Sequence, residues 1–163
     1  MRRKLYIVSL IVCAASCSPP SGGSKTTWHV DATHRFRFRY PVTWNRIDVG
    51  ATGVVMFTGG TSTQISVSRE KGGEREIADM LTYFKTTFPR YEELDAGWRD
   101  VNGRRAYLHT ARWNSPMGDI AALRMFLPVE DHFFIVTAST PQQQFERYLP
   151  LLRACVLSFE VTE

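Results

Sequence analysis

The chain has 163 residues, the length of a single domain that is large enough to bury a hydrophobic core. Its 20 Lys and Arg residues exceed its 16 Asp and Glu residues, which gives a formal net charge of +4. Arg2, Arg3 and Lys4 stand in a segment that we expect to be removed, so the remaining chain is close to neutral. The basic excess therefore does not indicate a nucleic-acid-binding protein.

Residues 1–16 have the pattern of a secretory signal peptide. A short apolar stretch follows the basic residues, and the small residues Ala14, Ala15 and Ser16 precede Cys17. The stretch is shorter than the roughly 20 residues that a membrane-spanning helix needs. The junction resembles the lipobox of bacterial lipoproteins, in which the cysteine is acylated, for example with palmitate, and becomes the mature N-terminus. Ala14 stands where the lipobox prefers leucine, and an ordinary signal peptide is the alternative.

Cys17 thus predicts a lipid-anchored protein of the cell envelope. Ser18 follows it in place of aspartate, which by the same resemblance implies the periplasmic face of the outer membrane; the extracellular surface is the alternative. Residues 17–27 are rich in Pro, Gly and Ser and are predicted to be a flexible linker before a domain at residues 28–163. An acylated Cys17 cannot pair with Cys155, which we interpret as a small buried hydrophobic residue.

The first half of the domain shows strand patterns and then a helix pattern. Residues 34–40 alternate arginine with aromatic residues, which predicts a strand with one buried face that ends at Pro41. Residues 53–58 and 64–69 predict two more strands around a turn at Gly59 and Gly60. Apolar residues then recur at helical spacing over residues 74–88, and Pro89 ends this predicted helix.

The second half is predicted to consist mainly of hairpins. Asn102 and Gly103 form a tight turn, because both residues tolerate a positive φ. The predicted strands are 96–101, 104–113, 120–127, 132–139 and a short closing strand at 158–161.

A capping-box pattern predicts where the last helix begins. Thr140 is the N-cap, Pro141 is the first helical residue and Gln143 is the third helical residue. Pro150 lies inside this helix and is expected to bend it. Hairpin-connected strands with helices packed on them indicate an α+β domain with a mainly antiparallel β-sheet.

In this order the elements resemble the PsbP-like fold. The segments that carry the resemblance are FRFRYPVTW (36–44), IADMLTYFKTTF (77–88), VNGRRAYLHTAR (101–112), FFIVTAST (133–140) and FERYLPLLRACVLSF (145–159). The photosystem II protein PsbP, DcrB-type bacterial lipoproteins and a Ran-binding nuclear import factor share this fold. The resemblance implies a sheet flanked by helices on both faces, an α/β/α sandwich. It implies no single activity, since such domains act as extrinsic subunits, assembly factors or binding modules.

The sequence holds no nucleophile elbow, phosphate-binding loop, dinucleotide fingerprint or zinc-finger spacing, and we expect no cofactor. His29, Asp31 and His34 are close together in the chain and could begin a metal site, with Asp131 or His132 as a further ligand. Polar surface residues at the entrance to a strand are the alternative. No segment matches a calcium-binding loop.

Arg35, Arg37 and Arg39 alternate with the aromatic residues and predict a row of guanidinium groups on one strand face. Such a row favours docking of an acidic partner or of lipid head groups. Arg105, and with it Arg104, Arg112 and Arg124, could extend the row. The alternative is a solvated face whose arginines pair with carboxylates such as Glu74 or Glu76. Core packing is the expected role of Trp44, Trp98 and Trp113.

These observations predict a non-catalytic, lipid-anchored domain that acts as a binding, scaffold or assembly subunit for a membrane or cell-envelope protein. We expect contact with the membrane through the lipid and no contact with nucleic acid. A small-ligand or calcium-type metal-binding protein is the first alternative. A hydrolase with a site at the sheet edge is the second, because catalytic groups can be distant in sequence.

Overall fold

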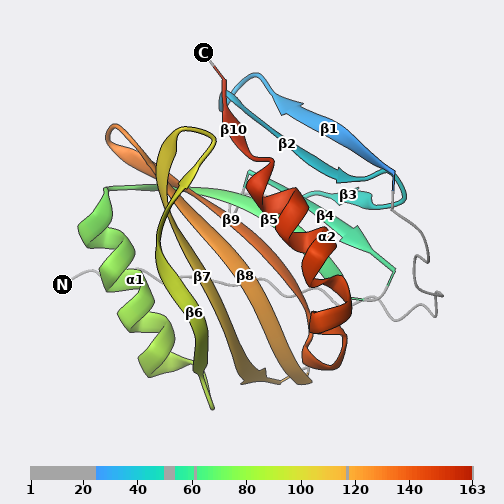
Figure 1. Cartoon of the computed structure of the whole chain (residues 1–163), viewed down its shortest axis with the longest axis vertical. Helices are drawn as coiled ribbons and strands as arrows, with labels where there is room; N and C mark the ends of the chain where they lie inside the picture. The colour runs from blue at the N-terminus through green and yellow to red at the C-terminus, as the bar shows by residue number, and fades with distance from the viewer. Residues whose placement is uncertain (1–24, 50–53, 61, 117, 163) are drawn as a thin grey trace.

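The structure is a computed structural model that describes residues 25–49, 54–60, 62–116 and 118–162. The predicted signal peptide, Cys17 and most of the predicted linker lie outside the described residues. Within the described part, neither helix is long and apolar enough to cross a membrane. The described residues form two antiparallel sheets and two α-helices, which confirms the α+β class (Figure 1). The sequence pattern did not separate the two sheets.

The smaller sheet consists of β1 (Thr26–Asp31), β2 (Phe36–Pro41) and β10 (Glu160–Val161), in the order β1-β2-β10. The predicted alternation of β2 is confirmed, because Phe36 and Phe38 are fully buried while Arg37 and Arg39, which alternate with them, are exposed. Phe36 stacks on Phe159 with ring centroids 5.2 Å apart. Figure 1 shows this sheet at the same end of the molecule as the C-terminus, beside α2 (Phe145–Leu157).

The larger sheet has seven strands in the order β3-β4-β5-β9-β8-β7-β6, and each neighbouring pair is antiparallel. The predicted turn is confirmed, since Asn102 and Gly103 have φ values of 54° and 76°. The bounds of the strands are β3 (Asn45–Ile47), β4 (Val55–Gly59), β5 (Thr63–Lys71), β6 (Glu92–Val101), β7 (Arg104–Ser115), β8 (Gly118–Val129) and β9 (His132–Pro141).

Helix α1 (Glu74–Thr87) follows the predicted helix closely. It begins after Gly73, whose backbone N–H donates to the Glu76 carboxylate at 2.8 Å. The predicted start of α2 is wrong. Thr140 still belongs to β9, where its buried hydroxyl bonds the hydroxyl of Thr63 on β5 at 2.8 Å, and a short 3-10 turn at Gln142–Gln144 precedes α2. The cross-strand hydrogen bond keeps Thr140 in the sheet.

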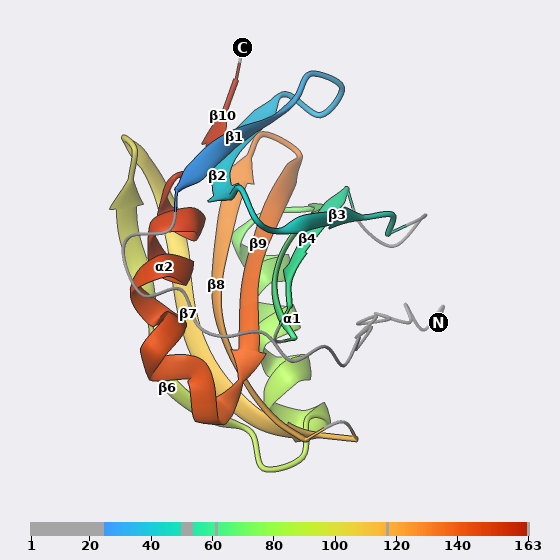
Figure 2. The same cartoon turned by 90° about the vertical axis from the view of Figure 1, so that its right-hand side faces the viewer.

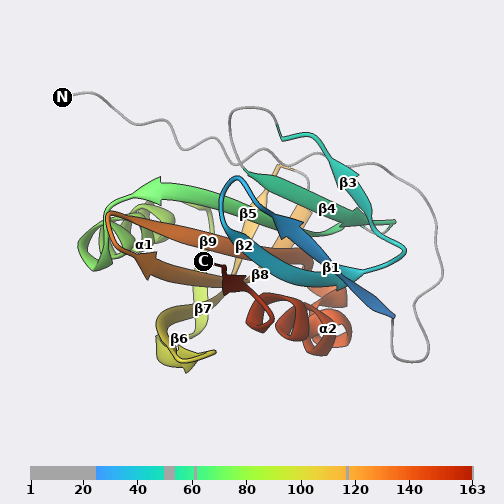
Figure 3. The ribbon, with the colours of Figure 1, turned by 90° about the horizontal axis from the view of Figure 1, so that it is seen from above.

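Alternate residues of β8 belong to different hydrophobic clusters. Leu123, Met125 and Leu127 pack in the cluster that contains the buried residues of α2. Phe126, between them, packs in the cluster that contains the buried residues of α1. Successive side chains of a strand point to opposite faces of its sheet. Figure 2 shows α1 and α2 on different sides of β8 and β9, and Figure 3 shows the smaller sheet from above.

Candidate functional site

The exposed face of the smaller sheet carries a tryptophan held between two arginines. Trp28 on β1 lies directly opposite Arg39 on β2. The guanidinium carbons of Arg37 and Arg39 lie 4.7 and 4.9 Å from the centroid of the Trp28 ring. Trp28 nevertheless remains 37% exposed. We call Trp28, Arg37 and Arg39 the Trp28 ladder; each cation–π contact in it contributes roughly 0.5–2 kcal/mol.

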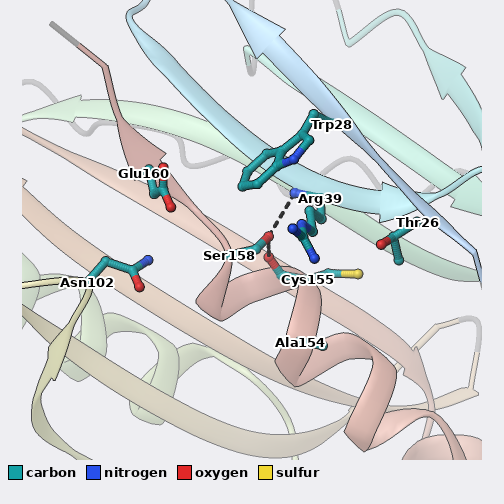
Figure 4. Close-up of a pocket in the computed structure, with 8 residues that line it drawn as sticks. All are labelled: Thr26, Trp28, Arg39, Asn102, Ala154, Cys155, Ser158 and Glu160. Carbon is teal, nitrogen blue, oxygen red and sulfur yellow. Dashed lines mark hydrogen bonds between the residues drawn. The ribbon is translucent and has the colours of Figure 1, made fainter.

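A pocket of about 250 Å³ lies beside the ladder, between the smaller sheet, the end of α2 and the β6–β7 turn. Figure 4 shows the side chain of Arg39 between Trp28 on one side and Ser158 and Cys155 on the other. This volume is below the roughly 300–1,000 Å³ of pockets for drug-sized ligands. It has eight lining residues: Thr26, Trp28, Arg39, Asn102, Ala154, Cys155, Ser158 and Glu160.

The two arginines of the ladder differ in their partners. Arg37 pairs with Glu160 of β10 through an Nη2–Oε2 contact of 2.6 Å and an Nε–Oε2 hydrogen bond of 2.7 Å. The guanidinium of Arg39 has no carboxylate partner among the described residues. Its backbone N–H instead donates to the hydroxyl of Ser158 at 2.7 Å. Within the described part of the chain, the Arg39 guanidinium is therefore a positive charge of the pocket that no carboxylate compensates.

Two further contacts fix the walls of the pocket. The side-chain amide of Asn102 donates to the carbonyls of Leu157 and Phe159 at 3.0 and 3.2 Å, which ties the β6–β7 turn to the end of α2. Cys155 is buried, and desolvation raises the pKa of its thiol to about 12. A thiolate nucleophile is therefore disfavoured at this position. The arrangement is suited to binding, with a flat aromatic ring, a free guanidinium and a small recess.

The structure keeps only part of the predicted arginine row together. Arg35 lies in the turn before β2 with a φ of 57°, so it is not on the strand face with Arg37 and Arg39. Arg105 belongs to the larger sheet, where it pairs with Glu74 of α1 at 3.0 Å and stacks on Trp98. The predicted alternative, pairing with a carboxylate such as Glu74, thus applies to Arg105. Arg124 is only 4% exposed and cannot extend a surface row.

The structure does not assemble the predicted metal site. The Asp31 carboxylate accepts a hydrogen bond from the backbone N–H of His34 at 2.8 Å and contacts its ring nitrogen at 3.1 Å. His29 packs instead among aromatic rings, and burial lowers its pKa. His132 contacts Asp131 and Arg69. Among the described residues there is no group of three or more metal-ligating side chains.

A second polar cluster lies beneath α1, and it was not predicted from the sequence. Arg124 of β8 lies between the rings of Phe84 and Trp113, with its guanidinium carbon 4.7 and 4.8 Å from their centroids. No described carboxylate pairs with it, and its buried Nη1 has no hydrogen-bond partner. Burial lowers the pKa of Arg124 to about 10, which leaves the side chain charged at neutral pH.

His109 of β7 stands opposite Arg124, and its Nε2 bonds the hydroxyl of Tyr91. Burial, with the nearby Arg124 charge, lowers the pKa of His109 to about 3, so the ring is neutral. The signal in the sequence is an arginine at a core-facing position of an apolar strand, AALRMFL. His109 and Arg124 are almost fully buried, whereas the Trp28 ladder is exposed beside a pocket, so we place the candidate binding site at the Trp28 ladder.

Comparison with known proteins gives matches in structure. No family model matches the chain, and no curated protein sequence matches it. Cyanobacterial PsbP (CyanoP) from Synechocystis superposes with a TM-score of 0.65 at 17% identity, covering 90% of this chain and 98% of that protein. The Ran-binding protein Mog1p from Saccharomyces cerevisiae gives a TM-score of 0.63 at 9% identity, covering 86% and 97%.

A third similar structure is LpqN of Mycobacterium tuberculosis, which is described as involved in cell envelope biogenesis. Its TM-score is 0.56 at 10% identity, and the match covers 87% of each chain. These similarities confirm the predicted PsbP-like fold. At such low identities they show the fold and leave the activity open.

Proposed function

We propose that the chain is a non-catalytic, lipid-anchored domain of the cell envelope that binds a protein partner through the Trp28 ladder. The observation that carries this proposal is the position of Trp28, which stays 37% exposed between two guanidinium groups and beside a recess. Tryptophan and arginine are among the residues most enriched at the energetic centres of protein interfaces. An exposed tryptophan adds little to the stability of the fold, so its place on this surface is better explained by contact with a partner.

Similar structures support a binding role. Mog1p is described as Ran-binding, and LpqN is described as involved in cell envelope biogenesis. The fold thus occurs in a Ran-binding protein and in a protein involved in cell envelope biogenesis. The division of β8 side chains between two hydrophobic clusters also supports the α/β/α sandwich that the sequence resemblance implies.

The position of the ladder is consistent with a partner at the membrane. β1 begins at Thr26, nine residues after Cys17. A chain of this length spans at most about 30 Å when fully extended. A lipid on Cys17 would therefore hold the ladder within reach of proteins embedded in the same membrane, at the periplasmic face of the outer membrane by our sequence-based expectation.

The partner-binding part of the proposal is tested by crosslinking in native membranes followed by mass spectrometry. Trp28→Ala and Arg39→Glu should each abolish the crosslinks to the captured protein. Leu94→Ala is the matched control, because Leu94 is 43% exposed on β6, away from the ladder. Crosslinks that persist in both ladder variants, or that disappear equally in the control, would refute the proposed site.

The lipid anchor is tested separately. The wild-type chain should incorporate radiolabelled palmitate and remain with the membrane fraction, while Cys17→Ser should do neither. Incorporation of palmitate into Cys17→Ser would overturn the anchor and leave the binding role to be judged by the crosslinks alone.

A further inference from the structure

Strand β1 forms one edge of the smaller sheet, and no described strand pairs with its outer side. The hydrogen-bond pattern shows which of its residues face outward. The backbone N–H of Val42 donates to the carbonyl of Lys25 at 3.0 Å, so these two opposed residues form a hydrogen-bonded pair. Hydrogen-bonded and non-hydrogen-bonded pairs alternate along an antiparallel ladder. Thr27, His29 and Asp31 therefore bond β2.

The intervening residues direct their backbone groups away from β2. Thr26, Trp28 and Val30 occupy the non-hydrogen-bonded positions, opposite Pro41, Arg39 and Arg37. The same alternation applies to β2. The backbone N–H of Arg39 points away from β1, within the plane of the sheet, and donates to the hydroxyl of Ser158. The outer edge of β1 thus presents the backbone N–H and C=O groups of every second residue, namely Thr26, Trp28 and Val30.

The side chains of this edge do not protect it. Proteins normally blunt an exposed edge strand with lysine, proline, a bulge or a cover, because the unpaired backbone groups are a template for another strand. β1 has the sequence TTWHVD and pairs with β2 without a register shift. Val30 is 62% exposed, and Trp28 and Val30 project on the same face. The edge therefore combines exposed apolar surface with backbone groups to which no described strand bonds.

The positive charge beside this edge favours a partner segment with acidic side chains. The guanidinium groups of Arg37 and Arg39 extend from β2 across to the Trp28 ring on β1, and that of Arg39 has no described carboxylate. Side chains of a strand added beside Trp28 and Val30 would lie next to these charges. A second copy of this chain, paired through the same edge, would bring two positive ladders together. Acidic side chains would instead meet the free guanidinium.

We propose that the outer edge of β1 adds an extended acidic segment of the protein partner as a further β-strand. The backbone of that segment bonds Thr26, Trp28 and Val30, and its carboxylates lie against the Trp28 ladder. Strand addition of this kind takes its affinity from main-chain hydrogen bonds and its specificity from side chains on alternate positions. The inference rests on the proposed partner-binding function and states the mode of binding and the partner's chemistry.

Proline substitution tests the outer edge of β1 while it leaves the hydrogen bonds between β1 and β2 in place. Val30→Pro removes an outward N–H that β2 does not use, and proline is tolerated where a strand's N–H faces solvent. Val30→Ala is the matched control, since it shortens the side chain and keeps the N–H. Thr26→Pro, at the first residue of β1, is a second variant should Val30→Pro fail to fold. Thermal melting confirms folding in each case.

The probe is a synthetic extended peptide of alternating Val and Glu, labelled for fluorescence anisotropy against the purified chain. It should bind the wild type, and Val30→Pro should weaken binding by about tenfold relative to Val30→Ala. Binding should weaken as salt rises, and a peptide of alternating Val and Lys should not bind. Equal binding to the Pro and Ala variants, or equal binding of both peptides, would overturn the proposal.

Three further outcomes distinguish strand addition from docking without it and from pairing between copies. Partner crosslinks that are lost in Trp28→Ala and retained in Val30→Pro would keep the docking function and overturn strand addition. A wild-type dimer in sedimentation experiments that Val30→Pro converts to monomers would overturn the acidic partner in favour of edge pairing between copies. Loss of partner crosslinks in Val30→Pro together with their retention in Val30→Ala would support strand addition.

Discussion

The hydroxyl of Tyr91 forms a hydrogen bond with Nε2 of His109 beneath α1, and the buried Nδ1 of the same ring has no partner among the described residues. The ring is fully buried, and desolvation lowers the pKa of His109 from 6.5 to about 3. In the unfolded chain the histidine gains a proton below pH 6.5, while in the native state it stays neutral. Protonation therefore favours the unfolded state over the pH range between these two values.

We predict that the free energy of unfolding falls as the pH is lowered from 6.5 towards 3. The slope from His109 is about 1.4 kcal/mol per pH unit, so the loss between pH 6.5 and pH 5 is about 2 kcal/mol. Urea unfolding at both pH values measures it. His109→Gln is the control, because it has no ring to protonate. Its free energy of unfolding should fall by about 2 kcal/mol less than that of the wild type over the same pH change. An identical acid dependence in both proteins would contradict the assignment.

Arg124 carries a buried charge with no described carboxylate, and this predicts opposite effects of two substitutions. Desolvation of an ion costs several kcal/mol, whereas the two cation–π contacts return roughly 2 kcal/mol each. Arg124→Met keeps an apolar chain between Phe84 and Trp113, and the melting temperature should be unchanged or higher. Arg124→Ala leaves a cavity between the two rings and should cost about 2–4 kcal/mol. A strongly destabilised Met variant would show that the charge itself is stabilising.

Asn102 serves both the β6–β7 turn and the end of α2. Its backbone has a φ of 54°, and its side-chain amide donates to two carbonyls of the α2 end. Asn102→Gly keeps the backbone freedom and removes the amide, so it should cost about 1–3 kcal/mol from the two hydrogen bonds. Asn102→Ala should cost about 1 kcal/mol more, because alanine tolerates this backbone region poorly. Chemical denaturation of the two variants separates the contributions.

Gly59 at the end of β4 leaves room for Trp44. A Cβ atom at this position would lie 2.6 Å from the indole nitrogen of Trp44, which is buried. Gly59→Ala should therefore displace the indole and destabilise the fold by about 1–3 kcal/mol. Gly73→Ala is the comparison, since a methyl group added there would have nothing within 4 Å, and it should cost less than about 1 kcal/mol. Similar melting temperatures for the two variants would argue against the close approach.

Strong periodicity made part of the fold predictable. Phe36 and Phe38 alternate with arginine, and the structure buries both phenylalanines. The Asn102–Gly103 turn follows from the tolerance of both residues for positive φ. Local sequence signals gave the wrong structure where a contact between distant residues determines the backbone conformation. Thr140 has every feature of an N-cap, yet its hydroxyl bonds Thr63, 77 residues earlier in the chain. β3 has three residues, too few for a period to show.

The candidate site was predictable only in part. Arg37 and Arg39 follow from the alternation of β2, but nothing local indicates that β1 places Trp28 between them. Arg35 has the same spacing and lies in a turn, because the strand begins one residue later. The Tyr91, His109 and Arg124 cluster joins a loop and two strands, so no short segment of sequence contains it.

Pro41 restricts how β1 and β2 can align. It stands opposite Thr26 at a non-hydrogen-bonded position, where its lack of an N–H leaves no bond to β1 unmade. Turning β2 over by one residue would put this proline at a position bonded to β1 and would also turn Phe36 and Phe38 out of the core. The proline thereby acts as a register lock. In the register that results, Trp28 and Val30, and not His29, direct their backbone groups to the outer edge of β1, where no described strand pairs with them.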